Sequence, residues 1–262
     1  DGLASEAGHA WVSFSDGSTW SLERIDPARL TPEGVFGVDG YGLTARGVSL
    51  AIAGLVHTET DVAIAGVGPR LELTRTYNSQ DRRVGVFGRG WTSSYETRAY
   101  ENCVAKDVTV LRGDGRREFF RWNGTNGYLT PSGYTASLVK TGTTGWVLNE
   151  ANGYVSTFRS DGRLTSIADA DNQKLNLVWN GSNQLTSVTD QVTGRDLTFT
   201  YAGSRVSSMS TSTVTGPGYS GPLTWNYVYS GTNLAKVCEP RNNDPLAGSC
   251  IGYTVTGGRI TQ

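Results

Sequence analysis

One short motif occurs twice between residues 160 and 204. Residues 161–169 read DGRLTSIAD and residues 182–190 read SNQLTSVTD, with Leu164 and Leu185 at equivalent positions 21 residues apart (185 − 164 = 21). Weaker copies follow at Val206, Leu234 and Ile260. A repeat with a period of about 20–50 residues is typical of stacked supersecondary units. The C-terminal half of the chain is therefore predicted to be an array of such units.

Each unit is predicted to be a β-hairpin. Large apolar residues occupy every second position of 175–179 (LNLVW) and 197–201 (LTFTY), which indicates strands with one face turned inward. Leu177, Phe199 and Tyr227 are expected to share that buried face. The apolar pair that opens each unit is instead three residues apart, as in Leu164 and Ile167. This spacing predicts a β-bulge at the same place in every unit, the usual way to curve a sheet.

The repeat pattern resembles a known family. Residues 162–169 follow Gly-x-Leu-x-x-Ile-x-Asp, and an aromatic residue ends the next strand, as in the YD repeats of Rhs-family proteins, teneurins and the shell-forming subunits of bacterial toxin complexes. Residues 74–79 (TRTYNS), 87–95 (FGRGWTSSY) and 113–117 (GDGRR) look like the uncharacterised domain that precedes those repeats in Rhs proteins. The motif residues that carry this resemblance are Arg75, Tyr77, Asn78, Phe87, Gly88, Gly90, Trp91 and Tyr95. The residue after each repeat aromatic departs from the family's aspartate, since it is Asn180, Ala202 or Ser230.

The resemblance implies an all-β fold in which antiparallel hairpin repeats form a continuous curved or spiralling sheet, part of a YD-repeat shell. We expect a lead-in hairpin and connector over residues 1–46, with a hairpin turning at Asp16-Gly17 and a helical turn at Pro27. An Rhs-type cap domain is expected over 47–130, with its 87–91 turn tucked inward, and the YD-repeat sheet over 131–262. Because no linker separates cap and repeats, the two are predicted to share one sheet.

Composition agrees with a turn-rich β protein and excludes several partners. The chain has 34 Gly, 7 Trp and 12 Tyr against a single Met, and its net charge is −1. A chain near neutrality is not expected to bind nucleic acid or an anionic membrane surface. Residues 48–56 form the longest nearly apolar run, which is too short to span a bilayer, so no membrane insertion is predicted. Because the chain begins at Asp1, a processed product or an excised piece is expected.

The cysteines predict one disulfide. Cys238 and Cys250 flank a polar loop, and a bond between them would contribute about 3 kcal/mol to the free energy of unfolding in the loop-entropy model. Such a bond implies a secreted or cell-surface protein. Cys103 is left over and is expected to be buried or paired outside this chain.

No enzyme motif accompanies these features. Only His9 and His57 are present, and neither a nucleophile motif, a zinc motif nor a phosphate-binding glycine loop occurs near them. Asp169, Asp171 and Asn172 resemble the start of a calcium loop but lack its glycine and closing glutamate. We therefore predict no catalytic residue, no cofactor and no metal site.

Two functions from different classes follow. The first is structural: the chain forms part of a β-shell or self-associating wall around a cargo, and its partners are its own C-terminal cargo domain, such as a toxin, or further copies joined edge to edge. The alternative is an adhesion module that binds carbohydrate or protein through exposed aromatic loops. Its candidate ligand contacts are Tyr219, Tyr134 and Trp146, and clustered, exposed aromatic side chains would favour it.

Overall fold

The computed structural model describes residues 54–125, 127–131, 133–143, 145–240, 250–256 and 259–261, and of residues 1–53 only the backbone of short strands. Side chains are described within 55–240, apart from 126, 132 and 144, and at 250–255 and 260. The expected helical turn at Pro27, the turn at Asp16-Gly17 and the side chains of Trp11 and Trp20 lie outside these residues.

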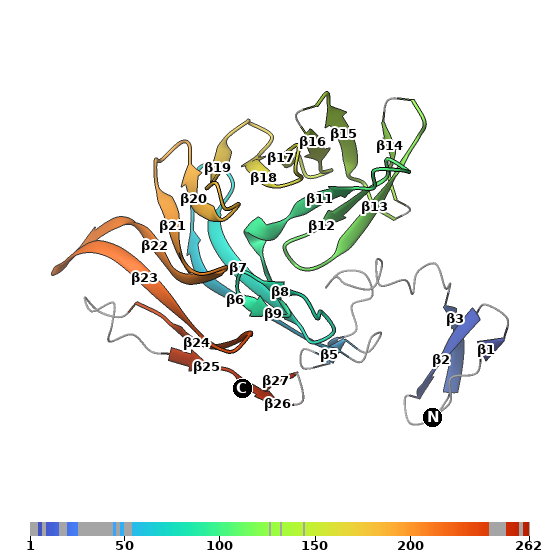
Figure 1. The fold of residues 1–262 in the computed structure, drawn as a ribbon, viewed down its shortest axis with the longest axis horizontal. Helices are drawn as coiled ribbons and strands as arrows, with labels where there is room; N and C mark the ends of the chain where they lie inside the picture. The colour runs from blue at the N-terminus through green and yellow to red at the C-terminus, as the bar shows by residue number, and fades with distance from the viewer. Residues whose placement is uncertain are drawn as a thin grey trace.

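The predicted all-β repeat fold is confirmed. Eleven antiparallel strands, β15 to β25, form one sheet in which every strand pairs with its neighbours in chain order. The sheet curves into an arc, and strands β6, β7, β11 and β12, which belong to residues 54–111, lie on its concave side (Figure 1). The strands of the large sheet are β15 (Ser137–Thr141), β16 (Gly145–Asn149), β17 (Val155–Arg159), β18 (Leu164–Ala168), β19 (Lys174–Trp179), β20 (Leu185–Asp190), β21 (Asp196–Ala202), β22 (Arg205–Gly216), β23 (Tyr219–Ser230), β24 (Asn233–Cys238) and β25 (Cys250–Gly252).

The predicted bulge occurs in four successive units, at the same place in each. In the β17–β18 ladder the register shifts so that Thr165 has no partner, and Thr186, Ser207 and Ala235 occupy the equivalent position in the next three units. The hydroxyl of Thr165 donates to the carbonyl of Thr157 at 3.0 Å. The extra residue explains the spacing of three in the opening apolar pair, because it lets both members of the pair turn inward.

The aromatic residue at the end of each hairpin strand reaches back to the strand before it. Trp179 Nε1 donates to the carbonyl of Leu164 at 2.8 Å, and Tyr201 Oη donates to the carbonyl of Leu185 at 3.0 Å. Tyr229 Oη likewise donates to the carbonyl of Val206 at 2.7 Å. These carbonyls belong to the residues just before the bulges, so the repeat aromatic satisfies backbone groups beside each bulge.

Four smaller sheets precede the repeats in the described part of the chain, and three of them lie within residues 44–129. The first has the order β10-β7-β6-β5-β4, the second the order β11-β12-β13-β14, and β8 pairs with β9. Their strands are β4 (Thr44–Ala45), β5 (Val48–Ser49), β6 (Gly54–Ile64), β7 (Leu71–Asn78), β8 (Val84–Gly85), β9 (Gly88–Arg89), β10 (Trp91–Ser93), β11 (Arg98–Glu101), β12 (Val108–Leu111), β13 (Arg117–Trp122) and β14 (Tyr128–Leu129), with a 3-10 turn, η2 (Ser94–Glu96), after β10. Separate short pairings join β1 (Ser5–Glu6), β2 (His9–Ser15) and β3 (Trp20–Ile25), and β26 (Thr254–Thr256) with β27 (Arg259–Thr261).

The prediction that cap and repeats share one continuous sheet is wrong. No ladder among the described residues joins β14 to β15, and the two belong to different sheets. Pro131, which lacks a backbone N–H, and Gly133, with φ +83°, lie between these strands and favour a turn over continued pairing. The two parts instead share one hydrophobic core.

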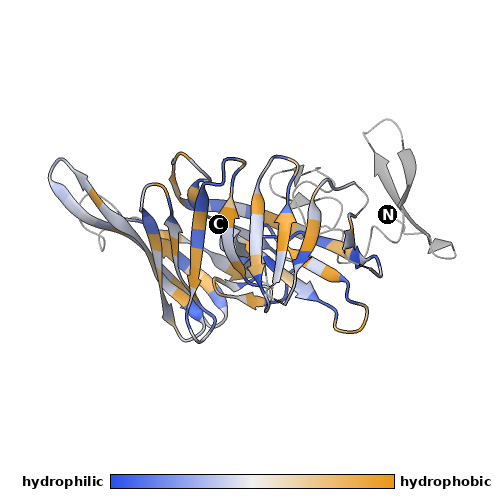
Figure 2. Ribbon diagram, turned by 90° about the horizontal axis from the view of Figure 1, so that it is seen from above, coloured by the Kyte–Doolittle hydropathy of each residue, from blue (hydrophilic) through white to orange (hydrophobic). Residues whose placement is uncertain are grey.

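That core lies between the concave face of the large sheet and the smaller sheets. Leu73, Phe120 and Leu148 are completely buried, and the predicted inner-face residues of the repeats are buried with them. Leu177, Phe199 and Tyr227 are 6%, 7% and 4% exposed, which confirms their shared face. Apolar residues alternate with polar ones along the strands (Figure 2). The cap therefore packs against the concave face of the curved sheet and fills the space on that side.

Candidate functional site: a buried arginine cluster between cap and repeats

Arg75 is the centre of the polar contacts that join cap and repeats. It belongs to β7, where it follows Leu71 and Leu73 on the inward face, and its side chain is 0% exposed. Across the ladder, Glu59 of β6 pairs directly with Arg75. The register of β6 then shifts between Thr60 and Val62, which leaves Asp61 without a partner. This bulge turns both Asp61 and Val62 toward the interior and places the Asp61 carboxylate on the arginine.

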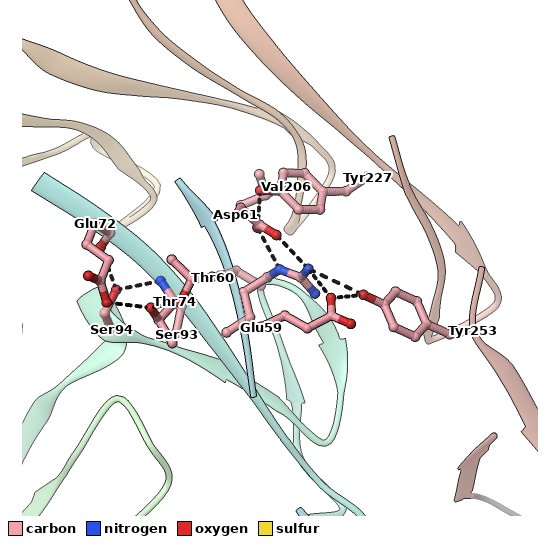
Figure 3. Close-up of polar contacts among 12 residues, drawn as sticks. Glu59, Thr60, Asp61, Glu72, Thr74, Ser93, Ser94, Val206, Tyr227 and Tyr253 are labelled. Carbon is pink, nitrogen blue, oxygen red and sulfur yellow. Dashed lines mark hydrogen bonds and ion pairs between the residues drawn. The ribbon is translucent and has the colours of Figure 1, made fainter. Parts of the chain in front are cut away.

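The guanidinium is held by two carboxylates and one hydroxyl. Arg75 Nε donates to Asp61 Oδ2 at 2.7 Å, and its Nη2 donates to Asp61 Oδ1 at 2.7 Å and to Glu59 Oε2 at 3.0 Å. Nη2 also lies 3.4 Å from the hydroxyl of Tyr253. The hydroxyl of Tyr227, from β23, donates to Asp61 at 2.7 Å, and that of Tyr253 donates to Glu59. Figure 3 shows the two carboxylates of β6 between these two tyrosines of the repeat region.

Aromatic rings enclose the same guanidinium. The Arg75 Cζ atom lies 4.7 Å from the ring centre of Trp91 and 5.6 Å from that of Tyr227. Trp91 in turn packs edge-on against Tyr253 at 5.4 Å and against Tyr77 at 5.4 Å. Cation–π contacts of this kind are strongest where water is excluded.

Burial, hydrogen bonds and neighbouring charges together set the pKa values of Arg75, Glu59 and Tyr227. Burial by itself lowers the pKa of Arg75, but the hydrogen bonds and charge of Asp61 outweigh it, and the net pKa is raised. Burial tends to raise the pKa of Glu59, whereas the hydrogen bonds from Tyr253 and His57 and the charge of Arg75 bring it below its ordinary value. The pKa of Tyr227 is raised well above normal, first by burial and then by the charge of Asp61. Glu59 and Arg75 are therefore charged, and Tyr227 and Tyr253 neutral, at pH 7.

The remaining motif residues of the cap lie in the same junction. Phe87 is 1% exposed and packs edge-on against Tyr227 at 5.0 Å, and Tyr95 packs against Phe199 at 6.5 Å. Asn78 is also buried, and its backbone N–H donates to the carbonyl of Gly90 at 2.8 Å. The turn around Phe87 is thus inserted between cap and repeats.

Glycine is required where that turn meets the repeats. Gly88 has φ +96°, and a Cβ there would lie 2.9 Å from the carbonyl oxygen of Thr232. The next residue, Arg89, donates its N–H to the same carbonyl at 2.9 Å. The close approach of the two backbones leaves no room for a side chain.

The predicted ligand-contact aromatics do not form an exposed group. Trp146 is 4% exposed, which contradicts its predicted place at a ligand surface. It points inward because it alternates with Val147 on β16, and its Nε1 donates to the hydroxyl of Tyr128 at 3.1 Å. Tyr134 and Tyr219 are half-buried, and the hydroxyl of Tyr219 donates to the carbonyl of Pro222 at 2.6 Å.

The cysteines and the acidic loop have simple structural settings. A disulfide joins Cys238 to Cys250. Cys103 is a free cysteine and is exposed, so burial, the first of its two expected settings, is wrong, and pairing outside this chain stays a prediction. Asp169 Oδ1 accepts hydrogen bonds from the N–H groups of Asp171 and Gln173 in a turn.

Within the described residues, no group of three or more His, Cys, Asp and Glu side chains could hold a metal ion. No helix in that part of the chain is long and apolar enough to cross a bilayer.

Sequence reasoning missed the partners of Arg75. Glu59 and Asp61 look like ordinary surface carboxylates in the sequence. The usable signal was Arg75 itself, since a charged residue at an inward position of an alternating strand requires a buried counter-charge. Tyr227 and Tyr253 carried no such signal, because they are 166 and 178 residues from the partners that they meet.

Comparison with known proteins gives matches of two kinds, to a family model and to individual relatives. Residues 46–120, which include the cluster residues of β6 and β7, match the family described as a domain of unknown function, DUF6531. The chain is also 31% identical over 141 residues to the tRNA nuclease WapA of Bacillus subtilis strain 168 and to the tRNA(Glu)-specific nuclease WapA of Bacillus subtilis subsp. natto. Each match covers 52% of this chain but only 6% of the relative. The two findings together support a family related to the one that the sequence motifs resemble.

Proposed function

We propose that this chain is a structural, non-enzymatic segment of a β-shell or self-associating extracellular wall that encloses or presents a cargo such as a C-terminal toxin domain. One observation carries the proposal: eleven strands form one sheet, bulges recur at one position in four successive units, and the cap fills the resulting concavity. Bulges that recur at one position bend a sheet progressively, so added units would extend the same arc.

The Arg75 cluster supports a structural role for the cap. Its members come from β6 and β7 on one side and from β23 and the residue after β25 on the other. Since Arg75 is fully buried, we infer that its guanidinium is not a substrate contact and that the cluster fixes the β23–β25 end of the large sheet on the cap.

The proposed location is the cell surface or the extracellular medium. The disulfide between Cys238 and Cys250 supports it, because such bonds persist in oxidising compartments. The word nuclease in the names of the relatives describes those proteins, of which the matched part is 6%. Accordingly, we propose no nuclease activity for this segment.

The adhesion alternative has weaker support. It requires clustered, exposed aromatic side chains, and Trp146 is buried. Among the described residues, the half-buried Tyr134 and Tyr219 remain, and neither lies beside an aromatic ring in the ring contacts found there.

The test is the native mass in solution, measured by light scattering over a range of protein concentrations. Self-association through open edges predicts masses that are multiples of 28.1 kDa. Val139→Lys places a charge on β15, at the end of the large sheet, where it should reduce the mass to that of the monomer. Val178→Lys is the matched control: both valines are exposed, at 45% and 53%, but Val178 lies in a central strand. A monomer at every concentration, or equal effects of both variants, would contradict association through the sheet edge.

A further inference from the structure

A cleft lies at the junction of cap and repeats, where both parts contribute residues to its lining. It has a volume of about 240 Å³ and is lined by the β8 region, by η2 and β11, and by the turns before β18 and after β19. This volume is below the roughly 300–1,000 Å³ of clefts that bind drug-sized molecules, so it suits a small ligand. Its apolar lining includes Val84, Val86, Leu111, Trp91 and Trp179.

Two arginines that line the cleft face each other across a β-bridge. Arg98, the first residue of β11, pairs with Arg163, just before β18, in an isolated antiparallel bridge. Like charges directly opposite each other in a sheet are destabilising. An anion close to both guanidinium groups would therefore stabilise this arrangement.

The carboxylates nearby compensate this pair only in part. Asp161 accepts two hydrogen bonds from Arg159, at 2.6 and 2.7 Å, and one from Arg163 at 2.5 Å. Arg98 reaches only the backbone carbonyl of Asp161, at 3.1 Å, and no described carboxylate forms an ion pair with it. Its Cζ atom lies 4.9 Å from the ring centre of the cleft residue Tyr100.

The ionisable residues on the opposite wall of the cleft are Asp81, Arg83 and Glu96. There Arg83 and Asp81 pair with each other at 2.5 Å and cancel. Glu96, which also lines the cleft, accepts a hydrogen bond from Ser93 at 3.1 Å and forms no ion pair with an arginine. Of the four arginines in and beside the cleft (83, 98, 159 and 163), three pair with Asp81 or Asp161, so Arg98 is the one for which no described carboxylate forms an ion pair.

We propose that this cleft binds a small monocarboxylate with an apolar body, with Arg98 and Arg163 holding the carboxylate and the apolar lining receiving the body. A carboxylate carries the single negative charge that the one unpaired guanidinium, Arg98, requires, whereas a phosphate monoester carries about −1.5 to −2 charges at pH 7. Arginine is also the side chain best suited to hold a planar carboxylate through two hydrogen bonds. This inference goes beyond the proposed wall function and does not depend on it.

The test uses benzoate as the probe and benzamide as its uncharged analogue, both titrated into the intact chain by calorimetry. Charge-assisted hydrogen bonds contribute about 1.5–3 kcal/mol, so benzoate should bind at least about tenfold more tightly than benzamide. Arg98→Gln and Arg163→Gln should each weaken benzoate at least about tenfold and leave benzamide unchanged. Arg121→Gln, at an exposed arginine of β13 that does not line the cleft, is the matched control and should bind benzoate like the parent chain.

Several results would overturn the proposal. These are equal affinities for benzoate and benzamide, benzoate binding that both cleft variants retain, or an equal loss in the Arg121 control. Phenyl phosphate that binds more tightly than benzoate would overturn the assignment to a carboxylate. If a cleft variant fails to fold, the test is made on the parent chain by comparing its melting temperature with each compound. Benzoate should raise that melting temperature more than benzamide does at the same concentration.

Discussion

Replacement of Arg75 by methionine should destabilise the protein more than any surface charge change. The substitution keeps an apolar stem of similar length but removes the guanidinium that compensates Asp61 and Glu59. Their side chains are 3% and 15% exposed, so water cannot take over this role. Breaking a buried ion pair from one side costs about 3–5 kcal/mol. For a chain of this size, 1 kcal/mol corresponds to about 2–4 °C, so the melting temperature should fall by about 6–20 °C.

Two further variants separate charge from packing. Arg75→Met combined with Asp61→Asn and Glu59→Gln removes the uncompensated negative charges, and we expect it to regain most of the lost stability. Arg83→Met is the matched control, since the Arg83 side chain is 43% exposed and its pair with Asp81 lies at the surface. An exposed pair contributes only about 0–1 kcal/mol.

The assay is thermal and urea unfolding at pH 7 followed by circular dichroism. The reasoning would be refuted if Arg75→Met were no less stable than Arg83→Met. It would also fail if the triple variant were less stable than Arg75→Met, because packing and not charge would then explain the loss.

Three other predictions concern the repeats and the cleft. Tyr201→Phe removes the hydrogen bond to the carbonyl of Leu185 and should lower the free energy of unfolding by about 1–2 kcal/mol in urea titrations, an effect that a surface Tyr→Phe change should not reproduce. Cys238 and Cys250 should resist alkylation in denaturant without reductant, and recovery of both as free thiols would refute the bond. Burial raises the pKa of Glu96 to about 7, above its unfolded value, so its neutral form favours folding. The contribution of Glu96 to the free energy of unfolding should therefore be highest below about pH 4.5 and should fall toward pH 7 by at most about 3 kcal/mol. Glu96→Gln should remove this dependence of the free energy of unfolding on pH.

The position of each bulge could be read from the sequence. The spacing of three between Leu164 and Ile167 is a local property of one strand and its turn, and Thr165 is the extra residue that it requires. The inward face of the repeats could also be read from the sequence, because Leu177 and Phe199 lie at every second position of their strands and are buried. Such patterns depend on residues within one hairpin, and neighbouring units repeat them.

The arginine cleft could not be predicted in this way. Arg98 and Arg163 are 65 residues apart (163 − 98 = 65) and come together through a single bridge between two sheets. The requirement for glycine at 162 also depends on the contact between cap and repeats. Gly162 has φ +82°, as a turn residue would, but a Cβ there would also lie 1.8 Å from the carbonyl oxygen of Ala99. The sequence shows only the turn.

The sequence by itself determined the hairpin repeats, the bulge in each unit and the inward position of Arg75, because these depend on the two-residue period of a strand and on where it is broken. The tertiary structure alone decided that cap and repeats form separate sheets, that Trp146 is buried, and that Tyr227 and Tyr253 meet the carboxylates of β6. These features depend on how far the sheet curves. That curvature is the sum of many small bends, and it brings together residues that share no local pattern.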